Sequence, residues 1–186
     1  MTEPTFPPTK RELRLWGRRL TPPTAMENHA VVEGLGGWVA VNRPESVLVY
    51  LAMPGELDLA SLVSGFQQVR WLTTRTPAAG WLTIHDHSAP RELHRLGYQN
   101  PVETAPTVDP SEVSAALVPG LCFDPTGTRL GWGRGFYDEL LSRTGGIRLG
   151  VTLERRIAAA IPVESHDIRM DLLATETGVR STHPPV

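Results

Sequence analysis

The stretch from residue 117 to residue 143 carries most of the residues whose types and spacing could do chemistry. It reads LVPGLCFDPTGTRLGWGRGFYDELLSR, with Gly131, Gly133 and Gly135 at alternate positions. Glycine removes side chains where the backbone must approach a ligand closely. Apolar residues recur at helical spacing directly after the glycines, so we expect a helix to begin there, and its free amides suit a phosphate. The pattern alone is weak, since it lacks the Walker lysine and the dinucleotide-loop spacing, and a glycine-rich surface turn explains it about as well.

Charged residues beside the glycines favour a site for a nucleotide with a metal ion. Arg129 and Arg134 flank the glycines, and arginine is a good bidentate partner for phosphate oxygens. Asp138 falls in the first turn of the expected helix, where a bare carboxylate would repel a bound phosphate unless Mg²⁺ stood between them. A favourable interaction with the helix dipole is the simpler explanation of Asp138, but it does not account for the neighbouring arginines and glycines.

Two further cations, Lys10 and Arg14, lie four residues apart near the N-terminus. Thr9 and Glu12 form a capping-box pattern that predicts a helix over residues 10–20, and this spacing puts both cations on one helix face. A solvated basic face is the commoner explanation of such a pair.

The remaining pattern predicts an α/β fold of three layers, with a mainly parallel central sheet and flanking helices. Thr24 and Glu27 open a second helix, which we expect to end near the glycines at 34, 36 and 37. Short apolar runs, typical of buried strands, lie at 47–52, 69–73, 81–84, 115–118, 148–153 and 170–174. Ligands bind at the carboxyl ends of parallel strands, so function should lie in the loops after Ala52, Val118 and Val151.

Composition predicts an ordinary globular protein with one domain over residues 1–186, a flexible arm at 1–8 and a flexible tail at 178–186. The 186 residues are 40% hydrophobic and 20% charged, with a formal charge of −2, which gives no sign of a nucleic-acid partner. No apolar run approaches the ~17 residues of a membrane helix. The single cysteine excludes an intramolecular disulfide, so we expect the reducing cytoplasm. We also expect a soluble monomer without a secretory signal.

Four segments of the chain together match one known pattern. They read KRELR at 10–14, YLAMPGE at 50–56, VPGL and FD followed by RLGWGRGFYD over 118–138, and IPVESHDIRMD at 161–171. In residues and in order they resemble the 5-formyltetrahydrofolate cyclo-ligase family, also called methenyltetrahydrofolate synthetase. The resemblance covers about residues 9–177, nearly the whole chain.

The resemblance implies a carbon–nitrogen ligase of folate and one-carbon metabolism. In that family 5-formyltetrahydrofolate and MgATP give 5,10-methenyltetrahydrofolate, ADP and phosphate. The formyl oxygen attacks the γ-phosphoryl group, and N10 then closes the ring as phosphate departs. Chemistry of this kind needs alignment and charge neutralisation more than a protein nucleophile.

The same resemblance implies roles for individual residues. The positions matching ATP-binding residues are Lys10, Arg14, Arg129, Leu130, Gly131, Trp132, Gly133, Arg134, Gly135, Phe136 and Tyr137. Asp138 and Asp167 match the magnesium positions. The substrate positions are Leu51, Glu56, Gly133 and Tyr137, and Glu56 is a plausible acceptor of hydrogen bonds from the pterin. Arg134 and Tyr137 lie where nucleotide and folate must converge, so we assign them catalytic roles.

Other residues with chemical potential have simpler explanations. Cys122 stands between Leu121 and Phe123, which is typical of a small buried hydrophobe rather than of a nucleophile. The histidines at 85, 87 and 94 with Asp86 could be drawn as a metal cluster, but no fourth ligand follows at a recognised spacing. His166 is more often a hydrogen-bonded structural residue than a base.

Two departures from the family pattern leave other functions open. Ala115 stands where members usually carry Asp, and Asn100-Pro101 stands where they often have Glu-Pro, which could alter one wall of the folate pocket. A divergent paralogue that acts as a nucleotide-binding or regulatory module therefore remains an alternative. So does another phosphoryl-transfer enzyme on the same scaffold, because fold does not imply function.

Overall fold

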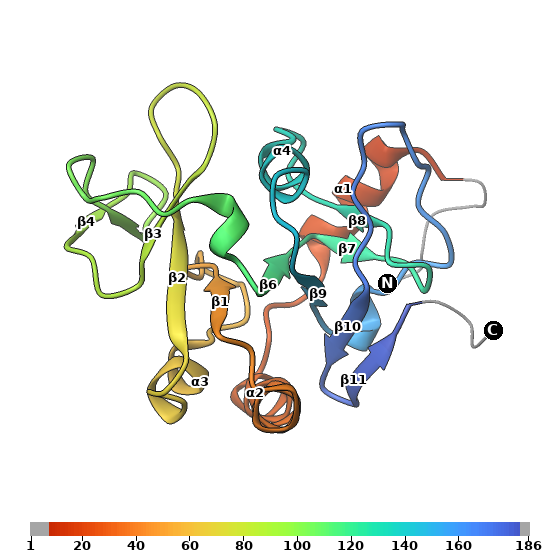
Figure 1. Cartoon of the computed structure of the whole chain (residues 1–186). Coiled ribbons are helices and arrows are strands. Elements are labelled where there is room, and N and C mark those ends of the chain that lie inside the picture. The colour runs from red at the N-terminus through yellow and green to blue at the C-terminus, as the bar shows by residue number, and fades with distance from the viewer. Residues whose placement is uncertain (1–7, 183–186) are drawn as a thin grey trace.

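The centre of the structure, a computed structural model that describes residues 8–182, is a seven-stranded sheet (Figure 1). Its order is β11 (Gly178–Ser181), β10 (Leu172–Thr175), β9 (Ile147–Val151), β6 (Ala115–Pro119), β1 (Ser46–Val49), β2 (Arg70–Arg75) and β3 (Thr83–Asp86). The strands from β10 to β2 are parallel, and the two edge strands run antiparallel to their neighbours. The predicted mainly parallel sheet is confirmed, and each predicted strand has its counterpart.

Helices cover both faces of the sheet, which gives the predicted three layers. Helices α2 (Ala25–Asn42) and α3 (Ala60–Gly65) pack on one face against Val47 and Val49 of β1. Leu48 points to the other face, as the alternation of a strand requires, and joins the cluster that contains α4 (Phe136–Leu141). Figure 1 shows α2 and α3 together on the side of the sheet away from α4 and α1.

The N-terminal helix packs on a small β-hairpin. Strands β7 (Cys122–Phe123) and β8 (Arg129–Leu130) pair antiparallel outside the main sheet. Helix α1 (Lys10–Arg19) buries Leu13 and Trp16 against this hairpin. The predicted capping box of α1 is present, because the Thr9 side chain accepts from the Glu12 amide while Glu12 reaches back. This packing places the first turns of α1 beside the glycine-rich loop that follows β8.

Helix α2 corrects one prediction, because it continues past the glycines to Asn42 and ends at Arg43 in the left-handed region with φ 47°. Two of these glycines lie against other segments instead, whereas Gly37 has nothing within 4 Å of an added Cβ atom. A Cβ atom at Gly36 would lie 3.3 Å from the Phe66 ring, and one at Gly34 would lie 3.6 Å from Gly178. The helix therefore uses small residues where it approaches neighbouring segments closely.

The C-terminal tail corrects a second prediction. Residues 178–181 form β11 rather than the start of a flexible tail, and Thr182 is buried, with its hydroxyl donating to the Met170 carbonyl at 2.8 Å. At the other end, Pro8 is buried. Residues 1–7 and 183–186, the rest of the predicted arm and tail, lie outside the described residues.

The remaining elements are a β-hairpin that the sequence did not reveal, formed by β4 (Arg91–Leu93) and β5 (Gln99–Pro101), and two 3₁₀ turns at Pro110–Glu112 and Glu154–Arg156. None of the helices in residues 8–182 has the length and apolar character needed to cross a membrane.

Candidate functional site

A cavity of about 1130 Å³ opens at the carboxyl ends of β1, β2 and β6. Its walls come from the segments that follow these strands, the β4–β5 hairpin, the glycine-rich loop before α4, and part of α1. The predicted loops after Ala52 and Val118 do line it, whereas Val151 borders a second, smaller cavity instead.

The structure brings every residue that the sequence analysis assigned to nucleotide, magnesium or substrate binding into this one cavity. The lining includes Lys10, Arg14, Leu51, Glu56, Arg129, Leu130, Gly131, Trp132, Gly133, Arg134, Gly135, Phe136, Tyr137, Asp138 and Asp167. These residues span most of the chain, so their convergence is a property of the fold rather than of a local motif.

The two cations of α1 contact two different walls. Lys10 Nζ lies 2.7 Å from Asp167 Oδ2 and 3.3 Å from Glu164 Oε2. Arg14, one turn later, donates from Nε to the Gly131 carbonyl at 3.3 Å. The basic face is therefore not simply solvated, because it joins α1 to an acidic segment and to the glycine-rich loop.

Arg129 and Asp138 form an ion pair at the floor of the glycine-rich loop. Arg129 Nη2 donates to Asp138 Oδ2 at 2.9 Å, and only 7% of Arg129 is exposed. The Ile168 amide donates to Asp138 Oδ1 at 3.4 Å. Arg129 Nε is buried and has no hydrogen-bond partner within residues 8–182. Arg129 nevertheless lines the cavity, and a guanidinium at a cavity wall suits an anionic ligand.

Glycine at the loop positions has a geometric reason. A Cβ atom at Gly131 would lie 2.6 Å from Arg129 Nη1, and Gly133 and Gly135 adopt φ of 99° and 67°. Side chains are strained in that left-handed region. The loop therefore presents backbone to the cavity directly before α4, as the sequence predicted.

The donor atoms that best suit a cation belong to the segment at 164–167. Within the described part of the chain, Glu164, His166 and Asp167 offer ligand atoms that all lie within 4.8 Å of one another. Burial raises the pKa of Asp167, but the hydrogen bonds from Lys10 and from the Glu164 amide outweigh it and lower the pKa below its ordinary value. The alternative cluster around His85 does not form such a group, since the His85 ring bonds Thr83 and the Pro106 carbonyl.

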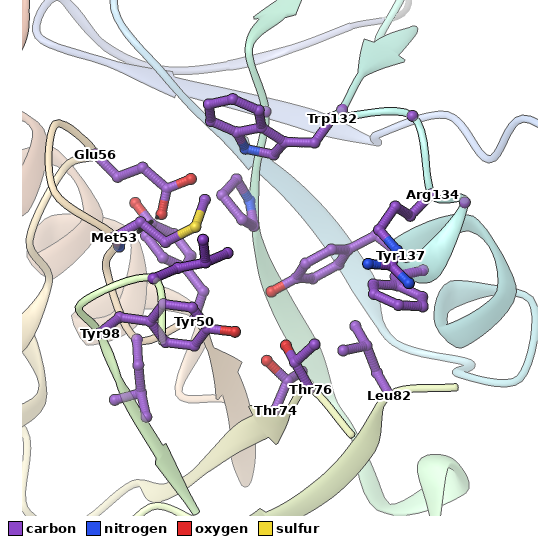
Figure 2. A pocket seen from close by; sticks show the side chains of 18 of the residues that line it. Tyr50, Met53, Glu56, Thr74, Thr76, Leu82, Tyr98, Trp132, Arg134 and Tyr137 are labelled. Carbon is purple, nitrogen blue, oxygen red and sulfur yellow. Dashed lines mark hydrogen bonds between the residues drawn. The ribbon is translucent and has the colours of Figure 1, made fainter. Parts of the chain in front are cut away.

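Aromatic and apolar side chains line the other end of the cavity. Tyr137 projects into it toward Thr74 and Thr76, with Tyr50, Tyr98 and Leu82 around it (Figure 2). Burial raises the pKa of the Tyr137 phenol, although a hydrogen bond with Thr74 opposes this, so the phenol keeps its proton at neutral pH.

Glu56 is the acid of this aromatic end. Burial raises the pKa of Glu56, while the hydrogen bond from the Met53 amide and the neighbouring Trp132 side chain oppose the rise. The Met53 amide donates to Glu56 Oε2 at 3.0 Å. Glu56 thus offers a carboxylate acceptor to a flat ligand between the aromatic rings.

Sequence reasoning missed several lining residues. They are Tyr50, Met53, Thr74, Thr76, Leu82, Tyr98 and the tip of the β4–β5 hairpin. Thr74 and Thr76 alternate at the end of a strand, which is the one signal that could have found them. Asn100, flagged as a departure, does line the cavity, and its amide bonds both backbone groups of Thr76. Cys122 is fully buried against α1, as predicted for a small hydrophobe.

Comparisons with known proteins agree with one another. The profile of the 5-formyltetrahydrofolate cyclo-ligase family matches residues 10–176. A 5-formyltetrahydrofolate cyclo-ligase of Saccharomyces cerevisiae is 26% identical over 182 residues, covering 83% of this chain and 86% of its own. One from Mycolicibacterium smegmatis is 28% identical, with coverages of 91% and 94%. The solution structure of 5,10-methenyltetrahydrofolate synthetase from Aquifex aeolicus superposes with a TM-score of 0.80 at 27% identity, covering 95% of this chain and 94% of that one.

Proposed function

The chain belongs to the 5-formyltetrahydrofolate cyclo-ligase family, and we propose that its large cavity converts 5-formyltetrahydrofolate to 5,10-methenyltetrahydrofolate at the expense of ATP. The observation that carries this function is the convergence of α1, the glycine-rich loop and the Glu56 segment on one cavity. One end of the cavity is cationic and the other is aromatic, which matches a substrate pair made of a polyphosphate and a flat pterin.

The cationic end holds the nucleotide. Lys10 and Arg14 approach from α1, Arg129 lines the wall, and Gly131, Gly133 and Gly135 expose the backbone of the loop. Arg134 extends from the loop with its guanidinium 4.9 Å from the Phe136 ring centroid, which leaves it at the boundary with the aromatic end. Arginines in this position bind and orient phosphate oxygens.

Asp138 and Asp167 are the residues that we propose for a magnesium ion, because carboxylate oxygens suit this ion. The ligand atoms that lie within 4.8 Å of one another in residues 8–182 come from Glu164, His166 and Asp167, and Asp138 is not among them. Both aspartates lie at the cationic end, and Glu164 and His166 add ligand atoms beside Asp167. When bound, the ion neutralises charge on the phosphates that are being transferred. In the described structure Lys10 and Arg129 balance these acids, so both cations are placed to exchange a carboxylate for a phosphate oxygen when the nucleotide enters.

The aromatic end holds the folate. Glu56 accepts hydrogen bonds from the pterin, Leu51 lies beside it, and Tyr50, Tyr98 and Tyr137 supply flat apolar surface. The Tyr137 phenol, protonated at neutral pH, can donate a hydrogen bond toward the formyl group. Arg134 lies on the nucleotide side of the formyl group. Together they align the formyl oxygen with the γ-phosphoryl group, so that this oxygen forms the new bond and ADP leaves.

Ring closure then needs little from the protein. N10 of the folate attacks the activated formyl carbon, and phosphate departs with the formyl oxygen. The residues that line the cavity supply alignment and charge, and none is required as a covalent nucleophile. Cys122 is fully buried, and the chemistry makes no use of it.

Two other functions remain to be distinguished by experiment: binding of a nucleotide without cyclisation, and phosphoryl transfer to a different acceptor. The assay is the absorbance change of methenyltetrahydrofolate formation with purified protein, 5-formyltetrahydrofolate and MgATP. We expect product only when ATP and magnesium are both present. Product formation that is equal without ATP or in excess EDTA would contradict the function, and ATP turnover that ignores the folate would indicate another acceptor.

The cellular setting belongs to the same proposal. A single cysteine favours the reducing cytoplasm, and a formal charge of −2 gives no sign of a nucleic-acid partner. We propose a monomer. Size-exclusion chromatography with light scattering tests the oligomeric state.

A further inference from the structure

Asn100 joins two walls of the large cavity that come from separate sheets. It lies on β5, in the hairpin outside the main sheet, whereas Thr76 directly follows β2 of the main sheet. The Thr76 amide donates to Asn100 Oδ1 at 3.0 Å, and Asn100 Nδ2 donates to the Thr76 carbonyl at 3.2 Å. A side-chain amide carries a donor and an acceptor next to each other, so it can serve both backbone groups of one residue at once.

These two bonds attach the hairpin to the end of β2. The pairing of β2 with β3 ends at Arg75, so Thr76 lies beyond it. Only 2% of Asn100 is exposed, and a buried hydrogen bond is costly to leave unmade. The ion pair of Arg75 with Glu92 joins the same two segments, but 51% of the Glu92 side chain is exposed, and exposed ion pairs contribute little. Asn100 is therefore the better shielded of these links.

Core packing does not fix the tip of the hairpin. Leu93 and Leu96 are 71% and 57% exposed, and a two-stranded hairpin is only marginally stable by itself. The hairpin and Thr76 nevertheless line the aromatic end of the cavity together. Figure 2 shows Tyr98 of the hairpin and Thr76 at this end, with the Tyr137 phenol projecting toward Thr76. The shape of the aromatic end therefore depends on how firmly the hairpin is attached to β2.

We propose that Asn100 is a positioning residue for the folate: its side-chain amide holds Thr76 and the β4–β5 hairpin together as one wall of the aromatic end. This role rests on the proposed function, because the folate is there the ligand of the aromatic end. Asn100 acts through the wall and takes no part in the reaction. Glutamate, which the family pattern often has at this position, carries no N–H for the Thr76 carbonyl when ionised, so the paired contact depends on the amide of this chain.

Loss of the contact should weaken folate binding through the free protein. Without the bonds of Asn100 the wall can relax, and the folate must order it again when it binds. The apparent dissociation constant then rises by the inverse of the fraction of protein that keeps the binding arrangement. The cationic end should be spared, because Lys10 and Arg129 make their contacts from α1 and β8.

The test compares Asn100→Asp with wild type in calorimetric binding of 5-formyltetrahydrofolate without ATP and in steady-state kinetics. Aspartate has nearly the same size and still accepts from the Thr76 amide, but when ionised it has no N–H for the Thr76 carbonyl. We expect Kd and KM for the folate to rise about tenfold, the size of one lost buried hydrogen bond, with kcat and KM for ATP within about twofold of wild type.

A second variant, Asn100→Ala, removes both bonds and allows the contact to be observed directly by hydrogen exchange of the Thr76 amide. In the free variant we expect this amide to exchange at least about tenfold faster than in wild type, because its acceptor is gone. Binding of 5-formyltetrahydrofolate should slow the exchange again, and Kd for the folate should rise at least as much as in Asn100→Asp.

Asn28→Asp is the matched control, because the chain repeats the same contact away from the cavity. The Asn28 side chain donates to the Asp58 carbonyl at 2.9 Å and accepts from the Asp58 amide at 2.7 Å. Within residues 8–182, neither Asn28 nor Asp58 is among the residues that line the large cavity. Asn28→Asp should therefore leave Kd and KM for the folate within about twofold of wild type.

Two results would overturn the positioning role of Asn100. An equal rise in KM for ATP would show that Asn100 supports the fold in general. Faster exchange of the Thr76 amide with an unchanged Kd for the folate would show that this wall does not govern binding. A wild-type protein that forms no methenyltetrahydrofolate contradicts the proposed function itself, whereas normal wild-type activity with unchanged folate constants in both Asn100 variants contradicts only this inference.

Discussion

Arg129 and Asp138 are bound to each other across the glycine-rich loop, with Arg129 Nη2 2.9 Å from Asp138 Oδ2. The two side chains are exposed by only 5% and 14%. Arg129 belongs to β8 and Asp138 to the first turn of α4, so this bond closes the loop that lies between them. Asp138 is therefore more than a partner of the helix dipole.

We expect Asp138→Asn to lower the free energy of unfolding by about 2 kcal/mol, because a buried guanidinium loses its charged acceptor. We also expect the magnesium concentration at half-maximal activity to rise, with partial rescue at high magnesium. Thermal melting and a magnesium titration measure the two effects. Asp171→Asn is the control, since Asp171 pairs with Arg148 in a more exposed ion pair and does not line the cavity formed by residues 8–182. Loss of stability without any change in magnesium dependence would assign Asp138 to the ion pair alone.

Lys10 should matter for the nucleotide rather than for the folate. Its ammonium lies 2.7 Å from Asp167 at the cationic end, where it can move to a phosphate oxygen. We expect Lys10→Gln to raise KM for ATP roughly tenfold to a hundredfold, as a lost charge-assisted hydrogen bond would, and to leave KM for the folate nearly unchanged. Arg11→Gln removes a neighbouring exposed charge from the same helix and should change neither constant.

The thiol of Cys122 should be dispensable for catalysis. Cys122 is fully buried beside Leu13 and Leu130, in the packing between α1 and the β7–β8 hairpin. We expect Cys122→Ala to keep its turnover within about threefold of wild type and to lose about 1 kcal/mol of stability, since the change leaves only a small cavity. A loss of more than about a hundredfold in a folded variant would be typical of a catalytic group and would contradict this reading.

The raised pKa of Glu56 should have opposite effects on activity and on stability. Burial raises its pKa above the ordinary value of 4.5, so kcat/KM for the folate should fall as pH drops through that raised pKa. The folded chain holds this proton more tightly than the unfolded chain does. Stability is therefore lost as pH rises from the ordinary pKa through the folded one.

We accordingly expect Glu56→Gln without ligands to melt at a higher temperature than wild type at neutral pH, and at nearly the same temperature below pH 4.5. The same variant should bind the folate more weakly and lose the acid limb of the pH profile. Melting curves at several pH values and kinetics on one preparation check both halves. A melting temperature that is lowered equally at all pH values would show that the Glu56 carboxylate stabilises the fold, which would contradict this prediction.

The sequence predicted the parts of the site that local pattern determines. The capping box at Thr9 fixed the start of α1, and therefore the face on which Lys10 and Arg14 lie. The glycines before Phe136 predicted a loop followed by the start of a helix. Continuous apolar runs identified the central strands because those strands are buried on both faces.

What the sequence could not reveal depends on contacts between distant segments. The glycines of α2 looked like a helix end, yet the helix continues past them, and Gly36 allows close packing against Phe66. The β4–β5 hairpin has an exposed first strand with no apolar alternation to mark it. Trp132 and Glu56 are far apart in the chain, and only the fold brings both to the wall of one cavity.

Gly131 gives the sharpest test of the loop, because changing it replaces no charged group. A Cβ atom at Gly131 would lie 2.6 Å from Arg129 Nη1, closer than real side chains approach, and the nearest atoms are all from that guanidinium. Backbone strain does not enter, since Gly131 is absent from the residues with positive φ. Gly131→Ala should therefore displace the Arg129 guanidinium from Asp138 while the fold stays intact.

We expect Gly131→Ala to raise KM for ATP at least tenfold and to lower the melting temperature modestly, because the end of a flexible side chain can move aside but loses a buried ion pair. Gly145→Ala is the matched control: a Cβ atom there meets nothing within 4 Å, and Gly145 lies beyond α4, away from the residues that line the cavity. In a Gly131→Ala, Asp138→Asn double variant the two effects on stability should be less than additive, since both act on one ion pair. Full additivity, or a Gly131→Ala enzyme with wild-type KM for ATP, would show that the position of Arg129 against Asp138 does not govern nucleotide binding.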